Sequence, residues 1–140
     1  DVDLTAPELS VRGRHERKIA IAPGVAAVIS GCISGESAAD NPVCPAGNGY
    51  ALDPGDLGAL LACAASDAGL VNQAEITPGA LRHTYISYLV RQGVRLSELE
   101  RVAGEIPPAV LAAYAPFSPP GSGLPMDSVA RGYPALIQLL

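Results

Sequence analysis

Residues 76–114 read ITPGALRHTYISYLVRQGVRLSELERVAGEIPPAVLAAY, and this is the most informative part of the chain. Thr77 followed by Pro78 is a typical helix start, because a hydroxyl can cap the free N–H groups and proline suits the first turn. Gly93 and Gly104 stand where helices would end, since glycine adopts the left-handed conformation of a helix terminus without strain. The stretch therefore predicts short helices that follow one another closely.

Apolar residues at helical spacing predict which side of the first of these helices is buried. Its expected core face consists of Leu81, Tyr85, Tyr88 and Leu89. The sequence Ser97-Glu98-Leu99-Glu100 has the pattern of a capping box and predicts the start of the next helix. A further short helix is expected from Pro107 to Tyr114.

Before this stretch, the segment Asp53-Pro54-Gly55-Asp56 is another strong helix start, with a carboxylate cap and proline at the first position. Gly69 is placed to end that helix. One apolar stripe is expected along it, formed by Leu57, Leu60, Leu61, Ala64 and Ala68.

The N-terminal part of the chain predicts a β-hairpin, because Leu9–Arg12 and Lys18–Ala22 are short apolar or alternating runs separated by Gly13 and charged residues. A short helix is expected over residues 25–29 and a loop over residues 30–52. The expected class is α+β: mainly helical, with a small antiparallel hairpin or sheet near the N-terminus.

The composition of the chain limits the class of protein and the cellular compartment that can be expected. A chain of 140 residues fits one domain and can bury a core. No apolar run reaches the roughly 20 residues of a membrane span, and no signal-peptide pattern opens the chain. The three cysteines, Cys32, Cys44 and Cys63, have no metal-binding spacing and are expected to be reduced thiols. We therefore expect a soluble, cytoplasmic protein without membrane contact.

The charge of the chain is uneven. Its net charge is −5, whereas proteins that bind nucleic acid usually carry a basic face. Residues 12–18 are basic, residues 24–75 contain no Lys or Arg, and four arginines return over residues 76–106. Two basic islands on either side of an acidic middle could still follow a phosphate backbone.

The residues from Ile76 to Tyr114 resemble the second half of the catalytic domain of the tyrosine recombinases, or phage integrases. In that family the text is close to ITPHxLRHTFATxLLxxGxxLxxIxxxLGHxxxxxTxxYxH, and the arginine, both glycines and the final tyrosine fall in register without a gap. The opening DVDL, followed by Leu9-Ser10-Val11-Arg12-Gly13, is similar to the family's entry into its hairpin. The resemblance covers residues 1–114 and leaves residues 115–140 as a Pro/Gly-rich tail with an apolar end.

The resemblance implies a DNA-cleaving site that needs no metal or cofactor. In the family a tyrosine phenol attacks the scissile phosphodiester and forms a phosphotyrosyl link, while arginines bind the non-bridging oxygens. Tyr114 matches this nucleophile and Arg82 matches the second arginine. The implied catalytic residues are Tyr114, Arg82, Arg14, Lys18, His83 and Glu105. The implied DNA-binding residues are Arg12, Arg14, Arg17, Lys18 and Arg82.

Each of these residues also has a structural interpretation. Tyr114 could pack at a helix end with its ring buried and its hydroxyl in water. Arg82 could be solvated or paired with a carboxylate. His83 is expected in a core or capping role, as in the family, where it is commonly structural.

The chain departs from the family pattern at several positions. Gly79 stands where the family has His or Lys, and Glu105 where it has His or Trp; a carboxylate there would repel the phosphate. The hairpin lysine that serves as proton donor has no direct match: Arg14 is nearest, and arginine releases a proton poorly near neutral pH. The family's first arginine lies just before the DVDL segment and is not within residues 1–140, so we expect this chain alone not to cut DNA.

Three interpretations follow. The first is a fragment of a tyrosine recombinase, which cuts and rejoins DNA at specific sites. The alternative is a catalytically degenerate domain of the same fold that binds DNA or another protein. The third is an unrelated helical interaction domain with a coincidental match. Residues 129–140 are apolar enough to dock on a second copy of the chain or on the core of their own chain. Of these two, we expect docking on the core of the same chain.

Overall fold

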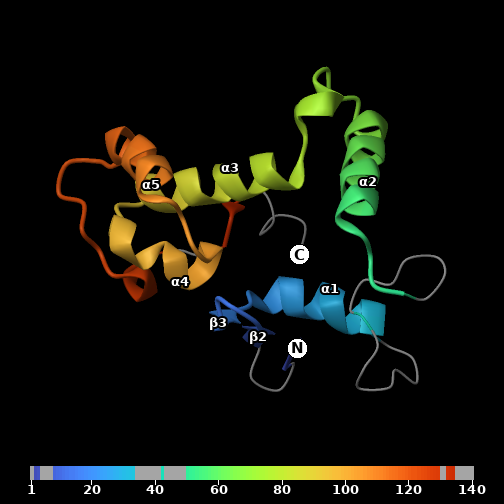
Figure 1. Cartoon of the computed structure of the whole chain (residues 1–140), viewed down its shortest axis with the longest axis horizontal. Coiled ribbons are helices and arrows are strands. Elements are labelled where there is room, and N and C mark those ends of the chain that lie inside the picture. Colours follow the sequence, from blue (N-terminus) through green and yellow to red (C-terminus); the bar gives the residue numbers. More distant parts are fainter. Residues whose placement is uncertain (1, 4–7, 34–41, 43–49, 130–131, 135–140) are drawn as a thin grey trace. The chain divides into compact units, whose positions relative to one another are not determined.

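The computed structural model of the chain describes residues 2–3, 8–33, 42, 50–129 and 132–134. The chain forms two compact units: the first comprises Asp1–Ala26 with Thr84–Leu140, and the second Ala27–His83. Figure 1 colours the helices and strands in chain order, from blue at the N-terminus to red at the C-terminus. The class is α+β, with helices predominating over one small antiparallel sheet, as the sequence predicted.

The first unit begins with the sheet. Its strands are antiparallel and pair in the order β1 (Val2–Asp3), β2 (Glu8–Val11) and β3 (Arg17–Ala20). Strands β2 and β3 form the predicted hairpin, with Val11 opposite Arg17 at its closed end. Gly13 lies in the turn at φ 107°, a backbone conformation that other residues rarely adopt.

The rest of the first unit is helical, and its segments are short because prolines and glycines interrupt them. The elements in chain order are the C-terminal part of α3 (Pro78–Arg91), η2 (Leu96–Glu98), α4 (Glu100–Ala103), α5 (Pro108–Tyr114), η3 (Ala115–Phe117) and η4 (Met126–Ser128). Gly93 and Gly104 both have positive φ, which confirms their predicted place at helix ends.

One apolar cluster forms the core of the first unit. Its fully buried members are Ile86, Leu89, Val90, Val94, Leu99, Ile106, Tyr114 and Met126. Half-buried apolar residues pack around it, among them Tyr85 and Tyr88. The predicted core face of α3 is thus confirmed for Leu89, which is buried, and in part for Tyr85 and Tyr88, which are half-buried. It is wrong for Leu81, which is 50% exposed, because the buried side of the helix is the one that carries Ile86 and Val90.

The second unit contains α2 (Pro54–Asp67), η1 (Gln73–Glu75) and the start of α3. Asp53 caps α2, with its side chain accepting a hydrogen bond from the Gly55 N–H at 2.7 Å, and Gly69 follows its end at φ 67°. Thr77 likewise caps α3 by accepting from the Ala80 N–H at 3.1 Å. These local predictions are confirmed.

The predicted apolar stripe of α2 is mostly exposed. Leu57 and Leu60 are 39% and 56% exposed, Leu61 is half-buried, and Ala65 is the buried residue of this helix. Helix α1 (Pro23–Ile33) also differs from expectation, since it continues four residues into the segment predicted as loop. Ser and Gly inside a helix cost only about 0.5–1 kcal/mol each, which neighbouring good helix formers can offset. The remainder of that predicted loop lies largely outside the described residues.

The predicted capping box at Ser97 does not form. No side chain caps η2 or α4, and the N-cap of α4 is Leu99. The carboxylate of Glu100, the fourth residue of that pattern, instead accepts a hydrogen bond from the backbone N–H of Ile106 at 3.4 Å. The glutamate that the pattern assigned to a helix start therefore bonds to a residue beyond the end of α4.

The segment after Tyr114 packs on the first unit. We call residues 118–129 the C-terminal strap. The strap places Met126 in the core cluster, and Val129 packs against that cluster. The predicted docking segment 129–140 is described only at Val129 and residues 132–134, where the Tyr88 hydroxyl donates to the Gly132 carbonyl and its ring meets Tyr133 edge to face.

In the part of the chain that the structure describes, no helix has both the length and the apolar character needed to cross a membrane.

Candidate functional site

The hairpin turn between β2 and β3 meets the end of α4 in the first unit. An open depression of about 630 Å³ lies there. Its lining combines residues of the turn with residues around α4, namely His15, Glu16, Arg17, Ser97, Glu100, Arg101, Gly104 and Glu105. Two of the predicted site residues, Arg17 and Glu105, are among them.

Arg17 fastens the hairpin to α4. Its Nε donates to the carbonyl of Val102 at 3.2 Å, and its Nη1 donates to the carbonyl of His15 at 3.1 Å. The guanidinium lies directly over Gly104, where an added Cβ would come within 3.1 Å of Cζ. Gly104 thus ends α4 at positive φ and leaves room for Arg17. These contacts already engage the Nε and Nη1 donors of Arg17. Its role in DNA binding stays a prediction.

Glu105 pairs with the hairpin turn. Its Oε2 lies 2.9 Å from Nε2 of His15, an ion pair when the imidazole is protonated. The two side chains are 60% and 43% exposed, so the pair contributes only about 0–1 kcal/mol. The pairing gives Glu105 a partner that the sequence interpretation did not anticipate, because the two residues are far apart in the chain and no local pattern links them.

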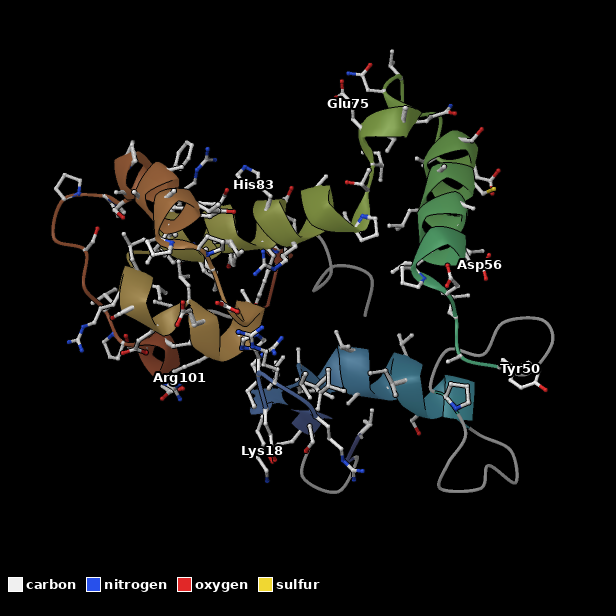
Figure 2. The ribbon with its side chains drawn as sticks, in the orientation of Figure 1. Lys18, Tyr50, Asp56, Glu75, His83 and Arg101 are labelled. Atoms are coloured by element: carbon white, nitrogen blue, oxygen red, sulfur yellow. The ribbon has the colours of Figure 1, made fainter. Side chains whose placement is uncertain are left out.

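The other basic residues of the hairpin are exposed. Lys18, labelled in Figure 2, lies on β3, and its Nζ is 3.0 Å from a carboxylate oxygen of Glu8 on the neighbouring strand. Arg12 and Arg14 lie in the turn with exposed side chains. Lys18 is therefore held along the sheet and does not line the depression formed by the turn and α4.

Tyr114 is the last residue of α5 and is only 3% exposed. Its ring is part of the core cluster of the first unit. This burial agrees with the structural interpretation, a helix-end tyrosine with a buried ring, more closely than with an exposed nucleophile. A phenol at this position would have to become accessible before it could attack a phosphodiester.

Arg82 and His83 belong to the second unit, in the second turn of α3, and both are exposed. His83, labelled in Figure 2, is therefore not a core residue, and that part of its expected role is wrong. Gly79 lies in the first turn of the same helix, with open space beside it apart from Thr77 Oγ1 at 3.7 Å from an added Cβ. The convergence of Arg82 with Tyr114 and the hairpin stays a prediction.

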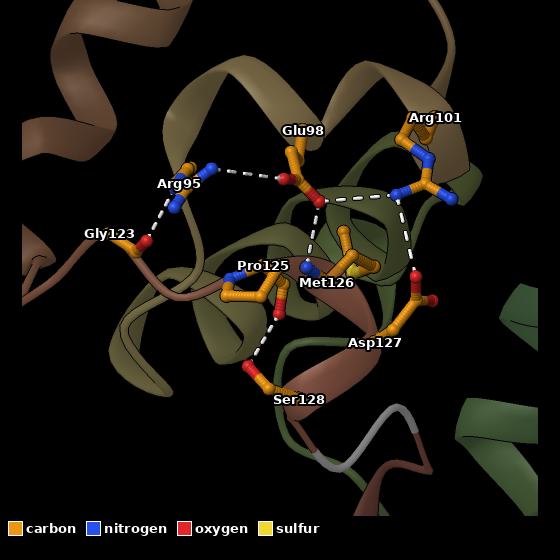
Figure 3. Close-up of polar contacts among 8 residues, drawn as sticks. All are labelled: Arg95, Glu98, Arg101, Gly123, Pro125, Met126, Asp127 and Ser128. Carbon is orange, nitrogen blue, oxygen red and sulfur yellow. Dashed lines mark hydrogen bonds and ion pairs between the residues drawn. The ribbon is translucent and has the colours of Figure 1, made fainter.

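A second polar cluster surrounds Glu98, whose side chain is only 18% exposed (Figure 3). Its Oε2 accepts from the Met126 N–H at 2.7 Å and from Arg101 Nη1 at 3.2 Å, while its Oε1 lies 3.9 Å from Arg95 Nη1. The Met126 hydrogen bond, with help from the two arginines, holds the pKa of Glu98 below its ordinary value against the opposing effect of partial burial. The sequence interpretation missed this cluster, because Met126 lies 28 residues after Glu98 and no local pattern links the two.

The described residues contain no group of three or more His, Cys, Asp or Glu side chains that could hold a metal ion. Among the cysteines, Cys63 is a free, exposed thiol. Cys44 lies outside the described residues.

Comparison with known proteins found no matching family model, no matching curated protein and no matching solved structure.

Proposed function

We propose that this chain comes from the catalytic domain of a tyrosine recombinase, an enzyme that cuts and rejoins DNA at specific sites. The proposal rests first on the gap-free register of Arg82, Gly93, Gly104 and Tyr114 within residues 76–114. The α+β class, with a hairpin before a set of short helices, agrees with it. Cytoplasmic location and DNA as partner belong to the same proposal.

The observation that carries the proposal furthest is the contact between the hairpin turn and the end of α4. In the tyrosine recombinases that the chain resembles, the hairpin supplies a proton donor, and the residue matching position 105 lies beside the scissile phosphate. Both should therefore border one site. Here His15 on the turn and Glu105 are 2.9 Å apart, and Arg17 covers Gly104. This contact between residues far apart in the chain supports the proposal.

In the proposed chemistry, Arg82 binds the non-bridging oxygens of the scissile phosphate. A guanidinium suits this task because its planar donors match two oxygens and carry a permanent charge. Arg82 lies one turn into α3, and the N-terminal end of that helix also favours an anion. The phenol of Tyr114 gives up its proton and its oxygen bonds to phosphorus, while the bond from phosphorus to the 5′-oxygen breaks. The 5′-oxygen takes up a proton and leaves as a hydroxyl, and a phosphotyrosyl link remains.

One observation favours a second candidate function, a domain of this fold that binds DNA or another protein without cleaving. Tyr114 is 3% exposed, and a buried phenol cannot reach a phosphodiester. The acidic balance of the chain and the carboxylate at Glu105 point the same way. The two candidates differ in whether Tyr114 ever becomes linked to DNA.

The first test is DNA binding, measured by fluorescence anisotropy with a labelled duplex over a series of salt concentrations. We compare the chain with its Arg82→Ala and Arg91→Ala variants. Arg91 is a matched control: it is exposed on the same helix, and nine positions along an α-helix is a rotation of about 180°, the opposite side. Loss of a charged hydrogen bond to phosphate should weaken binding roughly tenfold and reduce the salt slope by about 1.

The proposal predicts that Arg82→Ala weakens binding while Arg91→Ala leaves it nearly unchanged. Equal losses in both variants would mean that only net charge matters, which contradicts a phosphate site at Arg82. If the unaltered chain does not bind DNA even at low salt, DNA is not its partner. Because this chain alone is not expected to cut DNA, the test for cleavage uses the chain extended upstream to restore the family's first arginine. It is incubated with nicked duplexes and run on denaturing gels, and a covalent adduct that is lost in Tyr114→Phe supports cleavage over binding alone.

A further inference from the structure

Two groups of polar contacts attach the C-terminal strap to the first unit, in addition to the packing of Met126 and Val129 on the core cluster. The first group consists mainly of backbone hydrogen bonds. The N–H groups of Gly123 and Leu124 both donate to the carbonyl of Gly93 at 2.9 Å, and the Arg95 N–H donates to the carbonyl of Leu124 at 3.0 Å. Arg95 Nε adds a bond of 2.5 Å to the Gly123 carbonyl. Main-chain bonds of this kind need no particular side chain on the strap.

The second group depends on one side chain. The carboxylate of Glu98 receives the Met126 N–H at 2.7 Å, a length typical of a hydrogen bond to an ionised acceptor (Figure 3). Arg101 lies between two carboxylates, with Nη1 3.2 Å from Glu98 and 3.8 Å from Asp127 on the strap. The charged groups that face Glu98 are therefore Arg95, Arg101 and, across Arg101, Asp127.

The strap also completes the core. Met126 is 1% exposed and belongs to the same buried cluster as Tyr114, which is 3% exposed. In sequence, Tyr114 leads into η3 and then directly into the strap. Removal of Met126 from the cluster would open one side of it to water, so the burial of the cluster depends on the strap being in place.

We propose that the C-terminal strap is a cover over the core cluster that holds Tyr114, and that Glu98 is the residue that fastens it. Release of the strap uncovers the cluster and makes Tyr114 accessible. The strap has the properties of a segment that opens by itself: it is rich in Pro, Gly and Ser, its one regular element is a single 3-10 turn, and most of its residues other than Met126 are exposed.

Glu98 is a positioning residue in this proposal, because it acts on Tyr114 through the strap. Only the consequence for DNA cleavage rests on the proposed function. The opening of the strap can be measured without DNA, so a failure of this inference and a failure of the proposed function are distinguishable.

Met126 is the only methionine of the chain, which makes its oxidation a specific probe. Hydrogen peroxide converts the thioether to a sulfoxide and is reduced to water, and a buried thioether reacts only when the structure opens. After the thiols are blocked, the oxidation rate of Met126 is followed by mass spectrometry of peptides. Loss of the charged hydrogen bond in Glu98→Ala should speed oxidation by about tenfold or more. Glu98→Gln should be intermediate, since its amide oxygen can still accept.

Glu16→Gln is the matched control, because it removes one exposed carboxylate of the same unit on the hairpin turn. It should oxidise at the rate of the unaltered chain. Nitration of tyrosines by tetranitromethane, read in the same digests, then reports on Tyr114, with the 75% exposed Tyr50 as the accessible reference. Nitration of Tyr114 should rise in step with the oxidation of Met126.

Hydrogen exchange distinguishes opening of the strap from general unfolding. It is measured at the Val90 amide of α3 and at the Gln92 amide, which donates to the Tyr88 carbonyl. Their exchange should stay unchanged when Met126 oxidises faster. The inference is overturned if Glu98→Ala oxidises no faster than Glu16→Gln, if Tyr114 stays protected while Met126 reacts, or if the α3 amides exchange faster to the same extent.

A pH series on the unaltered chain provides a test that needs no variant. Protonation of Glu98 removes its charge, so Met126 should oxidise faster as the pH falls below about 4.3, the ordinary pKa of glutamate. In Glu98→Gln this acid-induced rise should disappear. A rise of equal size in both proteins would show that other groups control the strap, and would overturn the role of Glu98.

Discussion

The contact between Gly104 and Arg17 leads to a prediction about the stability of the first unit. Gly104 has φ 76° and ψ −168°, a region almost restricted to glycine, so an alanine there costs about 1–3 kcal/mol of backbone strain. The new Cβ would also lie 3.1 Å from Cζ and Nη1 of Arg17, closer than carbon normally approaches. The guanidinium would have to move and would weaken its bond to the Val102 carbonyl, which adds about 0.5–1.5 kcal/mol.

We therefore expect Gly104→Ala to lower the free energy of unfolding by about 2–4 kcal/mol, combining both effects. The assay is urea denaturation followed by circular dichroism. In an Arg17→Ala background the clash is absent, so the same substitution should cost only its backbone part. The difference between the two costs, a double-mutant coupling, isolates the contact.

Gly69→Ala is the matched control for the conformational cost. Gly69 also has positive φ, at 67°, but nothing lies within 4 Å of its added Cβ. Its substitution should show no coupling to Arg17. If Gly104→Ala costs as much with Arg17 present as without it, the packing of the guanidinium on Gly104 does not hold the hairpin to α4, and the reasoning is refuted.

Two further predictions concern the helix cap and the acid response. Asp53→Ala should destabilise the second unit by about 1 kcal/mol, because the Gly55 N–H loses its acceptor, whereas Asp53→Asn should cost much less; denaturant titration checks both, and equal losses would contradict the capping role. Because the pKa of Glu98 is lowered in the folded chain, its contribution to stability is present above the unfolded-state pKa and is lost as the pH falls through the folded-state value. Glu98→Gln should therefore show a flatter decline of stability between about pH 5 and 3 than the unaltered chain, and identical declines would rule out this contribution.

Several elements could be predicted from the sequence because their signals are local. Asp53 and Thr77 each accept a backbone hydrogen bond from an N–H two or three residues away, so a short pattern suffices to place the helix start. Gly93 and Gly104 end helices because only glycine adopts their φ without strain. The hairpin followed from alternation around Gly13, since the side-chain period of a strand is visible in the chain itself.

The candidate site could be predicted only in part. The sequence indicated which residues to consider, but the partners of those residues are distant in the chain. His15 meets Glu105, and Arg17 reaches the carbonyl of Val102. Glu98 accepts from the Met126 N–H, 28 residues further along the chain, and this contact depends on where the strap packs.

Capping, turn formation and side-chain alternation act over a few residues, so the starts of α2 and α3 and the hairpin could be predicted from the sequence. The burial of Tyr114, the histidine partner of Glu105 and the hydrogen bond from Met126 to Glu98 became visible only in the folded chain. The physical reason is that burial and ion pairing depend on which distant segments meet. That meeting is set by the packing of the whole core cluster and not by the residues next to each side chain.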